Sequence, residues 1–190
     1  MAGLPDVIEG KPKTGVLPPR LRTVLGFQVG KHVLGDIQRR FRTAHIVRLS
    51  QSDGASKAIC VESSDPLDQT RVVFEAGPLG GFETLTAVTV GRRDGFAAGS
   101  LTCSQSPAVS KKSTAAGGVG LEAHLEPTAR ALKADIGTTK TGLSEINFER
   151  VRQSRTPSGK SIDIEISSGI VARLVDGRID WFSIYYVEGI

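Results

Sequence analysis

Residues 170–187 read Ile-Val-Ala-Arg-Leu-Val-Asp-Gly-Arg-Ile-Asp-Trp-Phe-Ser-Ile-Tyr-Tyr-Val, two apolar runs on either side of an Asp-Gly pair. Asp-Gly readily adopts the positive φ angles of a two-residue hairpin turn, and β-branched and aromatic residues fill the flanking runs. The stretch therefore predicts an antiparallel hairpin near the end of the chain. Apolar runs at 71–74 and 85–90 predict a similar hairpin in the first half.

Each predicted hairpin follows a short segment whose apolar residues have helical spacing. These positions are Leu34, Ile37 and Phe41 in the first half and Ala129, Leu132 and Ile136 in the second. Because the elements recur in the same order over 25–91 and 120–187, we expect two repeated units, each a short helix followed by an antiparallel β-meander. One unit cannot bury its apolar face alone, so the expected class is α+β, with the two sheets joined or apposed around a shared core.

The remaining segments complete the predicted domain organisation. Residues 1–20 are rich in proline and glycine and are expected to be extended and flexible. Residues 92–119 are rich in glycine and serine and are expected to form an exposed linker. The two units then span 21–91 and 120–190. The 39% apolar content and the 22 glycines favour a protein of strands and turns over a helical bundle.

The basic residues of the chain are scattered, and its formal net charge is +4. The main groups are Arg39, Arg40 and Arg42, and Arg92 with Arg93. A nucleic-acid-binding protein usually gathers its positive charge on one element, so this scatter favours an ordinary solvated surface. Nucleic-acid binding through these arginines remains an alternative.

The two cysteines bear on the cellular compartment. Cys60 lies in an apolar run typical of a strand, and Cys103 follows the first predicted hairpin. A disulfide between them would indicate an oxidising compartment, and two reduced thiols are the alternative. No apolar run approaches the length of a membrane span. Residues 1–20 lack the apolar core of a signal peptide, so the chain is either cytosolic or a mature form without its leader. We expect a periplasmic or secreted protein.

The helical segment at 125–137 and the strand pair that turns at Asp176-Gly177-Arg178 resemble known repeat units. They are similar to the unit of the β-lactamase inhibitor protein and of the small lipoprotein of the outer-membrane β-barrel assembly machinery. The chain departs from this pattern at 124–127, where a glycine-bearing start is expected, and at Phe41-Arg42, which replaces a Leu-Gly end. The resemblance implies an exported protein that acts by binding other proteins.

Sequence patterns of catalysis and metal binding are not found. Residues 158–161 resemble the end of a phosphate-binding loop, but Ser154 replaces a required glycine and the residues that follow alternate as in a strand. The three histidines, His32, His45 and His124, have neither metal-ligand spacing nor a catalytic partner in view. We therefore predict no enzyme activity, no metal and no cofactor.

The last strand holds the best candidate binding residues. Regular alternation places Trp181 and Tyr185 on one face together with Ile179. Tryptophan and tyrosine are favoured in protein interfaces, although both faces could instead be covered as core. The predicted function is a non-enzymatic exported protein that binds another protein or supports the cell envelope through this sheet surface. A nucleic-acid-binding protein and a small-ligand carrier remain alternatives.

Overall fold

A computed structural model describes residues 8–9, 11–49, 56–80, 83–94, 101–139 and 141–189. The strands of its large sheet are β1 (Ile8–Glu9), β2 (Lys13–Thr14), β5 (Val47–Leu49), β6 (Ser56–Ser63), β7 (Thr70–Ala76), β8 (Leu85–Arg92), β9 (Ser104–Ser106), β10 (Gly137–Thr139), β11 (Ser144–Arg155), β12 (Ser161–Val175) and β13 (Arg178–Gly189). The smaller elements are the hairpin β3 (Thr23–Val24) and β4 (Phe27–Gln28), the helices α1 (Leu34–Arg40) and α2 (Glu126–Leu132), and the 3-10 turns η1 (Pro19–Arg22) and η2 (Pro78–Gly80).

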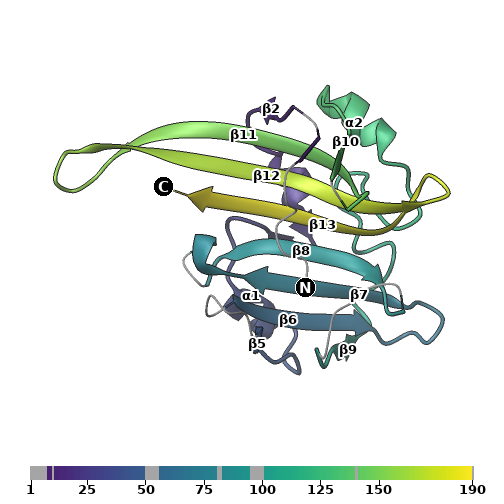
Figure 1. The fold of residues 1–190 in the computed structure, drawn as a ribbon. Coiled ribbons are helices and arrows are strands. Elements are labelled where there is room, and N and C mark those ends of the chain that lie inside the picture. The colour runs from purple at the N-terminus through teal and green to yellow at the C-terminus, as the bar shows by residue number, and fades with distance from the viewer. Residues whose placement is uncertain are drawn as a thin grey trace.

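The described strands other than β3 and β4 form one mixed sheet that dominates the molecule (Figure 1). Its order is β1-β10-β11-β12-β13-β8-β7-β6-β5, with antiparallel neighbours throughout. The short strands β2 and β9 add to it in parallel, β2 on β11 and β9 on β6. The strands of the two halves meet where β13 pairs with β8, with Ile184 opposite Val88.

The prediction of an α+β fold built from two repeated helix-plus-meander units is wrong. Both α-helices have seven residues, whereas β12 alone has 15, so the fold is dominated by its sheet. The second helix ends early because Lys133 adopts a left-handed conformation, with φ +50°, and its N–H bonds back to Ala129 and Arg130. A helix of this length covers little of the sheet, and the pairing of β13 with β8 leaves no boundary between two separate units.

The main core lies against one face of the sheet and is covered largely by irregular chain. Leu17, within the predicted flexible segment, is fully buried there. Val109 and Val119, within the predicted linker, are buried in the same core, while residues 95–100 of that linker lie outside the described part of the chain. These parts of both segments therefore contribute to the core. None of the described helices is both long and apolar enough to cross a membrane.

Several strands and turns follow their local sequence closely. The run at 71–74, expected as a strand of the first hairpin, lies within β7. The Asp-Gly turn is present, with positive φ angles at Asp176 (51°) and Gly177 (73°). The first strand of the hairpin expected from residue 170 begins earlier, because β12 runs without a break from Ser161 to Val175.

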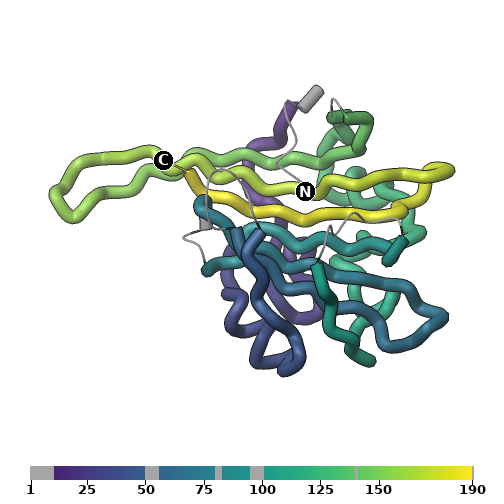
Figure 2. Tube along the Cα trace, turned by 60° about the horizontal axis from the view of Figure 1, so that its bottom comes forward, coloured from purple at the N-terminus to yellow at the C-terminus, as the bar shows by residue number. Residues whose placement is uncertain are grey.

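The hairpin of β11 and β12 extends beyond the neighbouring strands (Figures 1 and 2). We call residues 150–164 the arm. Its tip is a tight turn in which the Thr156 N–H donates to the Lys160 carbonyl at 2.9 Å and the Gly159 N–H donates to the Thr156 carbonyl at 2.8 Å. This turn contains the residues that resembled a phosphate-binding loop, and a strand rather than a helix follows it.

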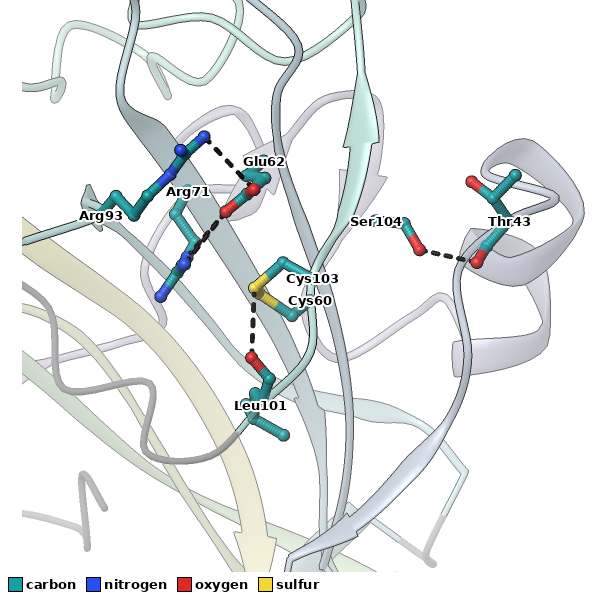
Figure 3. Close-up of a disulfide and its surroundings, with 8 residues drawn as sticks. All are labelled: Thr43, Cys60, Glu62, Arg71, Arg93, Leu101, Cys103 and Ser104. Carbon is teal, nitrogen blue, oxygen red and sulfur yellow. Dashed lines mark hydrogen bonds and ion pairs between the residues drawn. A yellow bond between two sulfur atoms is a disulfide. The ribbon is translucent and has the colours of Figure 1, made fainter. Parts of the chain in front are cut away.

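Of the two alternatives left open for Cys60 and Cys103, the structure has the disulfide (Figure 3). It lies on the face of the sheet opposite the main core, where Leu101 and Cys103 pack against Ala58, Cys60 and Val73. The bond holds the chain around 101–106 against the sheet, next to the parallel pairing of β9 with β6.

Candidate functional site

A row of residues crosses five strands on the face of the sheet opposite the main core. Direct strand pairing places Arg173 opposite Trp181, Trp181 opposite Gly91, Gly91 opposite Arg71, and Arg71 opposite Glu62. We call these five residues the Trp181 row. They come from β12, β13, β8, β7 and β6, so the row joins both halves of the chain.

Trp181 occupies the middle of this row and is partly exposed. On β12 its neighbour is Arg173, whereas Gly91 on β8 offers no side chain beside the indole. Trp181 is the chain's only tryptophan. Tryptophan and arginine are both enriched at protein interfaces, and here a partly accessible indole lies between arginines.

Acidic residues hold the arginines of this surface in place. The Glu62 carboxylate, 8% exposed, accepts from Arg71 at 3.0 Å and pairs with Arg93 at 3.2 Å, beside the disulfide (Figure 3). The Arg173 Nε donates to Asp180 at 2.8 Å. Fixing these guanidinium groups before binding reduces the side-chain entropy that a partner has to remove.

Sequence reasoning missed Glu62, Arg71 and Arg93 as parts of this surface, although one signal was available. Glu62 and Arg71 lie nine residues apart at the ends of two consecutive predicted strands. In an antiparallel hairpin such positions lie opposite each other, and opposite charges there attract. Arg93 reaches the same carboxylate from just beyond β8.

The structure separates the three predicted binding residues. Trp181 remains partly exposed, but Ile179 is 1% exposed and belongs to the main core. The reason is a bulge: β12 pairs Arg173 with Trp181 and Leu174 with Ile179, which leaves Asp180 as an extra residue on β13. The extra residue breaks the alternation and moves Ile179 to the opposite face from Trp181.

Tyr185 shares the face of Trp181 but is 6% exposed. Its hydroxyl donates to Glu145 Oε1 at 2.6 Å and lies 2.9 Å from Asn147 Oδ1. Its ring lies over Gly169, where a Cβ would come within 2.7 Å of the phenol oxygen. Burial raises the pKa of the Tyr185 phenol, so it stays protonated and acts as a donor. Tyr185 is therefore a buried support of the sheet.

Glu145 gives this buried cluster a dependence on pH. It is 1% exposed, and within the described chain its Oε2 has no hydrogen-bond partner. Burial raises the pKa of the Glu145 carboxyl above its ordinary value of 4.5, although the bond from Tyr185 opposes the shift. Ionised Glu145 therefore costs folding free energy.

We expect Glu145→Gln to stabilise the protein at pH 8 and to leave its stability at pH 4 nearly unchanged. The folded pKa is raised, so the wild-type protein loses stability as pH rises from about 4.5 through the folded value, and a neutral amide removes that loss while its oxygen still accepts from Tyr185. Urea unfolding of both proteins at a series of pH values measures the difference. If the free energy of unfolding changed with pH in the same way for the two proteins, the assignment of this pH dependence to Glu145 would be wrong.

None of the cavities in the described part of the chain is lined by a residue of the Trp181 row. The larger one, about 480 Å³, lies between residues 67–70, Arg92, Lys111 and Glu122, and a neighbouring cavity of about 450 Å³ shares Lys111 with it. Arg92 and Lys111 both pair with the Glu122 carboxylate, so these three charged groups already satisfy one another. A small-ligand site therefore finds no specific support in these groups.

The basic residues named from the sequence are likewise partly engaged in ion pairs. Arg39 pairs with Asp36, Arg92 with Glu122 and Arg93 with Glu62. Arg40 and Arg42 are exposed near the end of α1. In the described part of the chain, no group of three or more histidine, cysteine, aspartate or glutamate residues is arranged to hold a metal ion.

Comparison with known proteins assigns no family or function to this surface. The chain matches no family model, no curated protein and no solved structure. The resemblance to the β-lactamase inhibitor protein and the assembly-machinery lipoprotein therefore stays a prediction.

Proposed function

We propose that this chain is an exported, non-enzymatic protein that binds another protein through the Trp181 row. The observation that carries the proposal is the partly exposed Trp181 between Arg173 and the Arg71–Glu62 pair. Tryptophan and arginine at the centre of such a surface commonly supply most of the binding free energy.

The disulfide supports the exported location in this proposal. Bonds of this kind persist in oxidising compartments such as the periplasm or the extracellular space and are rare in the cytosol. Here the bond between Cys60 and Cys103 borders the proposed surface, because Glu62 follows Cys60 by two residues on β6 (Figure 3). It thereby holds one end of the row in place.

We expect Trp181→Ala to weaken partner binding by at least about thirtyfold, the effect of removing an interface residue worth about 2 kcal/mol. The free energy of unfolding should change by less than about 1 kcal/mol, because the indole is partly exposed and lies outside the main core. The immobilised protein is incubated with the secreted or periplasmic proteins of its source, and retained partners are compared between variants. Binding of a purified partner is then measured by titration, with Trp181 fluorescence as a second readout of burial.

The matched control is Val175→Ala, which truncates an apolar side chain that is 52% exposed at the end of β12. This variant should retain the partner. The proposal fails if Trp181→Ala retains the partner as well as the wild-type protein does. It also fails if that variant unfolds, because the indole would then be a structural residue.

A further inference from the structure

The arm has an open strand edge that no described segment covers. On this side of β11, β10 pairs with Ser144 and Glu145, and β2 pairs with Phe148 and Glu149. The chain of β2 then leaves the edge at Gly15, whose N–H makes a last bond of 2.8 Å to the Glu149 carbonyl. From Arg150 to Arg155, β11 pairs within the described chain with β12 alone.

The alternation of a strand decides which backbone groups this edge presents. Because the Glu149 carbonyl points outward to Gly15, the N–H and C=O groups of Val151, Gln153 and Arg155 point outward too. The pairing of β11 with β12 runs without a bulge from Ser144 to Arg155, so the alternation is unbroken. Proline and bulges, which normally protect such an edge, are missing from 150–155.

The charge of the arm indicates what this edge accepts. Within 150–164 the basic residues are Arg150, Arg152, Arg155 and Lys160, and the acidic residue is Asp163. Arg152 pairs with Glu188 at 3.2 Å, while the other three basic side chains form no ion pair within the described chain. Arg150 and Arg152 share one face of the strand, and the 61% exposed Val151 lies on the other face between them.

A second copy of the chain would bring like charges together in two of the antiparallel registers open to this edge. If two β11 edges paired antiparallel about Arg152, that arginine would face its own copy, and in the neighbouring register about Val151, Arg150 would face Arg152. Like charges directly opposite each other destabilise a strand pair. The same arginines would attract a strand that carries carboxylates.

We propose that the outer edge of the arm, residues 150–155, binds an extended acidic segment of another protein as an added β-strand. The segment has acidic residues at two alternating positions, opposite Arg150 and Arg152, and an apolar residue between them, opposite Val151. Backbone hydrogen bonds to the outward groups supply affinity, and the arginines select the charge. This site is separate from the Trp181 row and stands without the function proposed above.

The test uses the full chain and a blocked synthetic hexapeptide, Thr-Glu-Val-Glu-Val-Thr. Peptide at saturation should slow amide hydrogen exchange at least tenfold at Val151 and Gln153, whose N–H groups point outward. Exchange at Arg152 should not change, because its N–H already faces β12. The same peptide with methylated backbone nitrogens should not bind, because it cannot form the strand pairing.

Two variants separate the backbone contribution from the charge contribution. Val151→Pro removes an outward N–H without removing a bond to β12, and it should abolish peptide binding while protection at Arg152 persists. Arg150→Gln with Arg152→Gln should weaken binding at least tenfold. Arg40→Gln with Arg42→Gln makes the same change of charge on exposed residues near α1 and should leave peptide binding unchanged.

Four results would each overturn the proposal. The first is the absence of protection by the acidic peptide, and the second is equal protection by the peptide with lysine in place of glutamate. The third is protection that grows with protein concentration alone, which would make a second copy the occupant. The fourth is duplex DNA that binds the arm more tightly than the peptide and is released by salt, which would make nucleic acid the ligand.

Discussion

Replacing Phe182 with alanine should lower the free energy of unfolding by about 3–5 kcal/mol. Phe182 is fully buried in the main core, on the strand that joins the two halves of the sheet. Its neighbours across the ladders are Val90 on β8 and Ala172 on β12. Both belong to strands paired on either side, so they cannot move into the space that the ring leaves.

The measurement is urea unfolding followed by far-UV circular dichroism and by Trp181 fluorescence. Leu67→Ala is the control, because Leu67 is 93% exposed and its truncation should change stability by less than about 0.5 kcal/mol. A loss below about 1 kcal/mol for Phe182→Ala would mean that β13 does not hold the central position assigned to it.

Removing the disulfide should have an effect of similar size. Cys60 and Cys103 are 43 residues apart, and closing a loop of that length stabilises the folded chain by about 4 kcal/mol in the chain-entropy model. Cys60→Ala with Cys103→Ala should therefore lower the melting temperature by about 10 °C in a chain of this size. The main core lies on the opposite face of the sheet, so the fold itself should persist.

Reductant provides the internal control for this prediction. It should lower the melting temperature of the wild-type protein toward that of the double variant and should leave the variant unaffected. Amide exchange in β9 should accelerate in both cases, because the bond holds this short strand near β6. If reduction lowered the free energy of unfolding by less than about 1 kcal/mol, the unfolded chain would gain little conformational freedom when the bond opens.

Local sequence patterns predicted those parts of the structure that depend on residues close together in the sequence. The Asp176-Gly177 hairpin and the strand at 70–76 are present because turn conformation and strand alternation are properties of short stretches. The pairing of Cys60 with Cys103 was also within reach, since two cysteines allow one intramolecular bond. The helical spacing of the apolar residues predicted a longer second helix than the structure has, because a left-handed Lys133 ends that helix after seven residues.

The candidate surface was only partly visible in the sequence. Trp181 was named from the sequence because a large aromatic residue in the last strand of the chain stands out without any structural information. Ile179 was placed beside it on the assumption of unbroken alternation, which the extra residue Asp180 invalidates. Tyr185 was named from the sequence as a candidate binding residue, but residues about 40 positions away, Glu145 and Asn147, bind its hydroxyl in the interior.

The sequence by itself determined where the chain turns and which stretches are extended, because φ preferences and two-residue alternation act over a few residues. Only the tertiary structure decided that β13 pairs with β8 across more than 90 positions, and that pairing merges the two halves into one sheet and assembles the Trp181 row. Pairing between distant strands depends on how the whole apolar face is buried, and one bulge is enough to exchange the inside and outside of a strand.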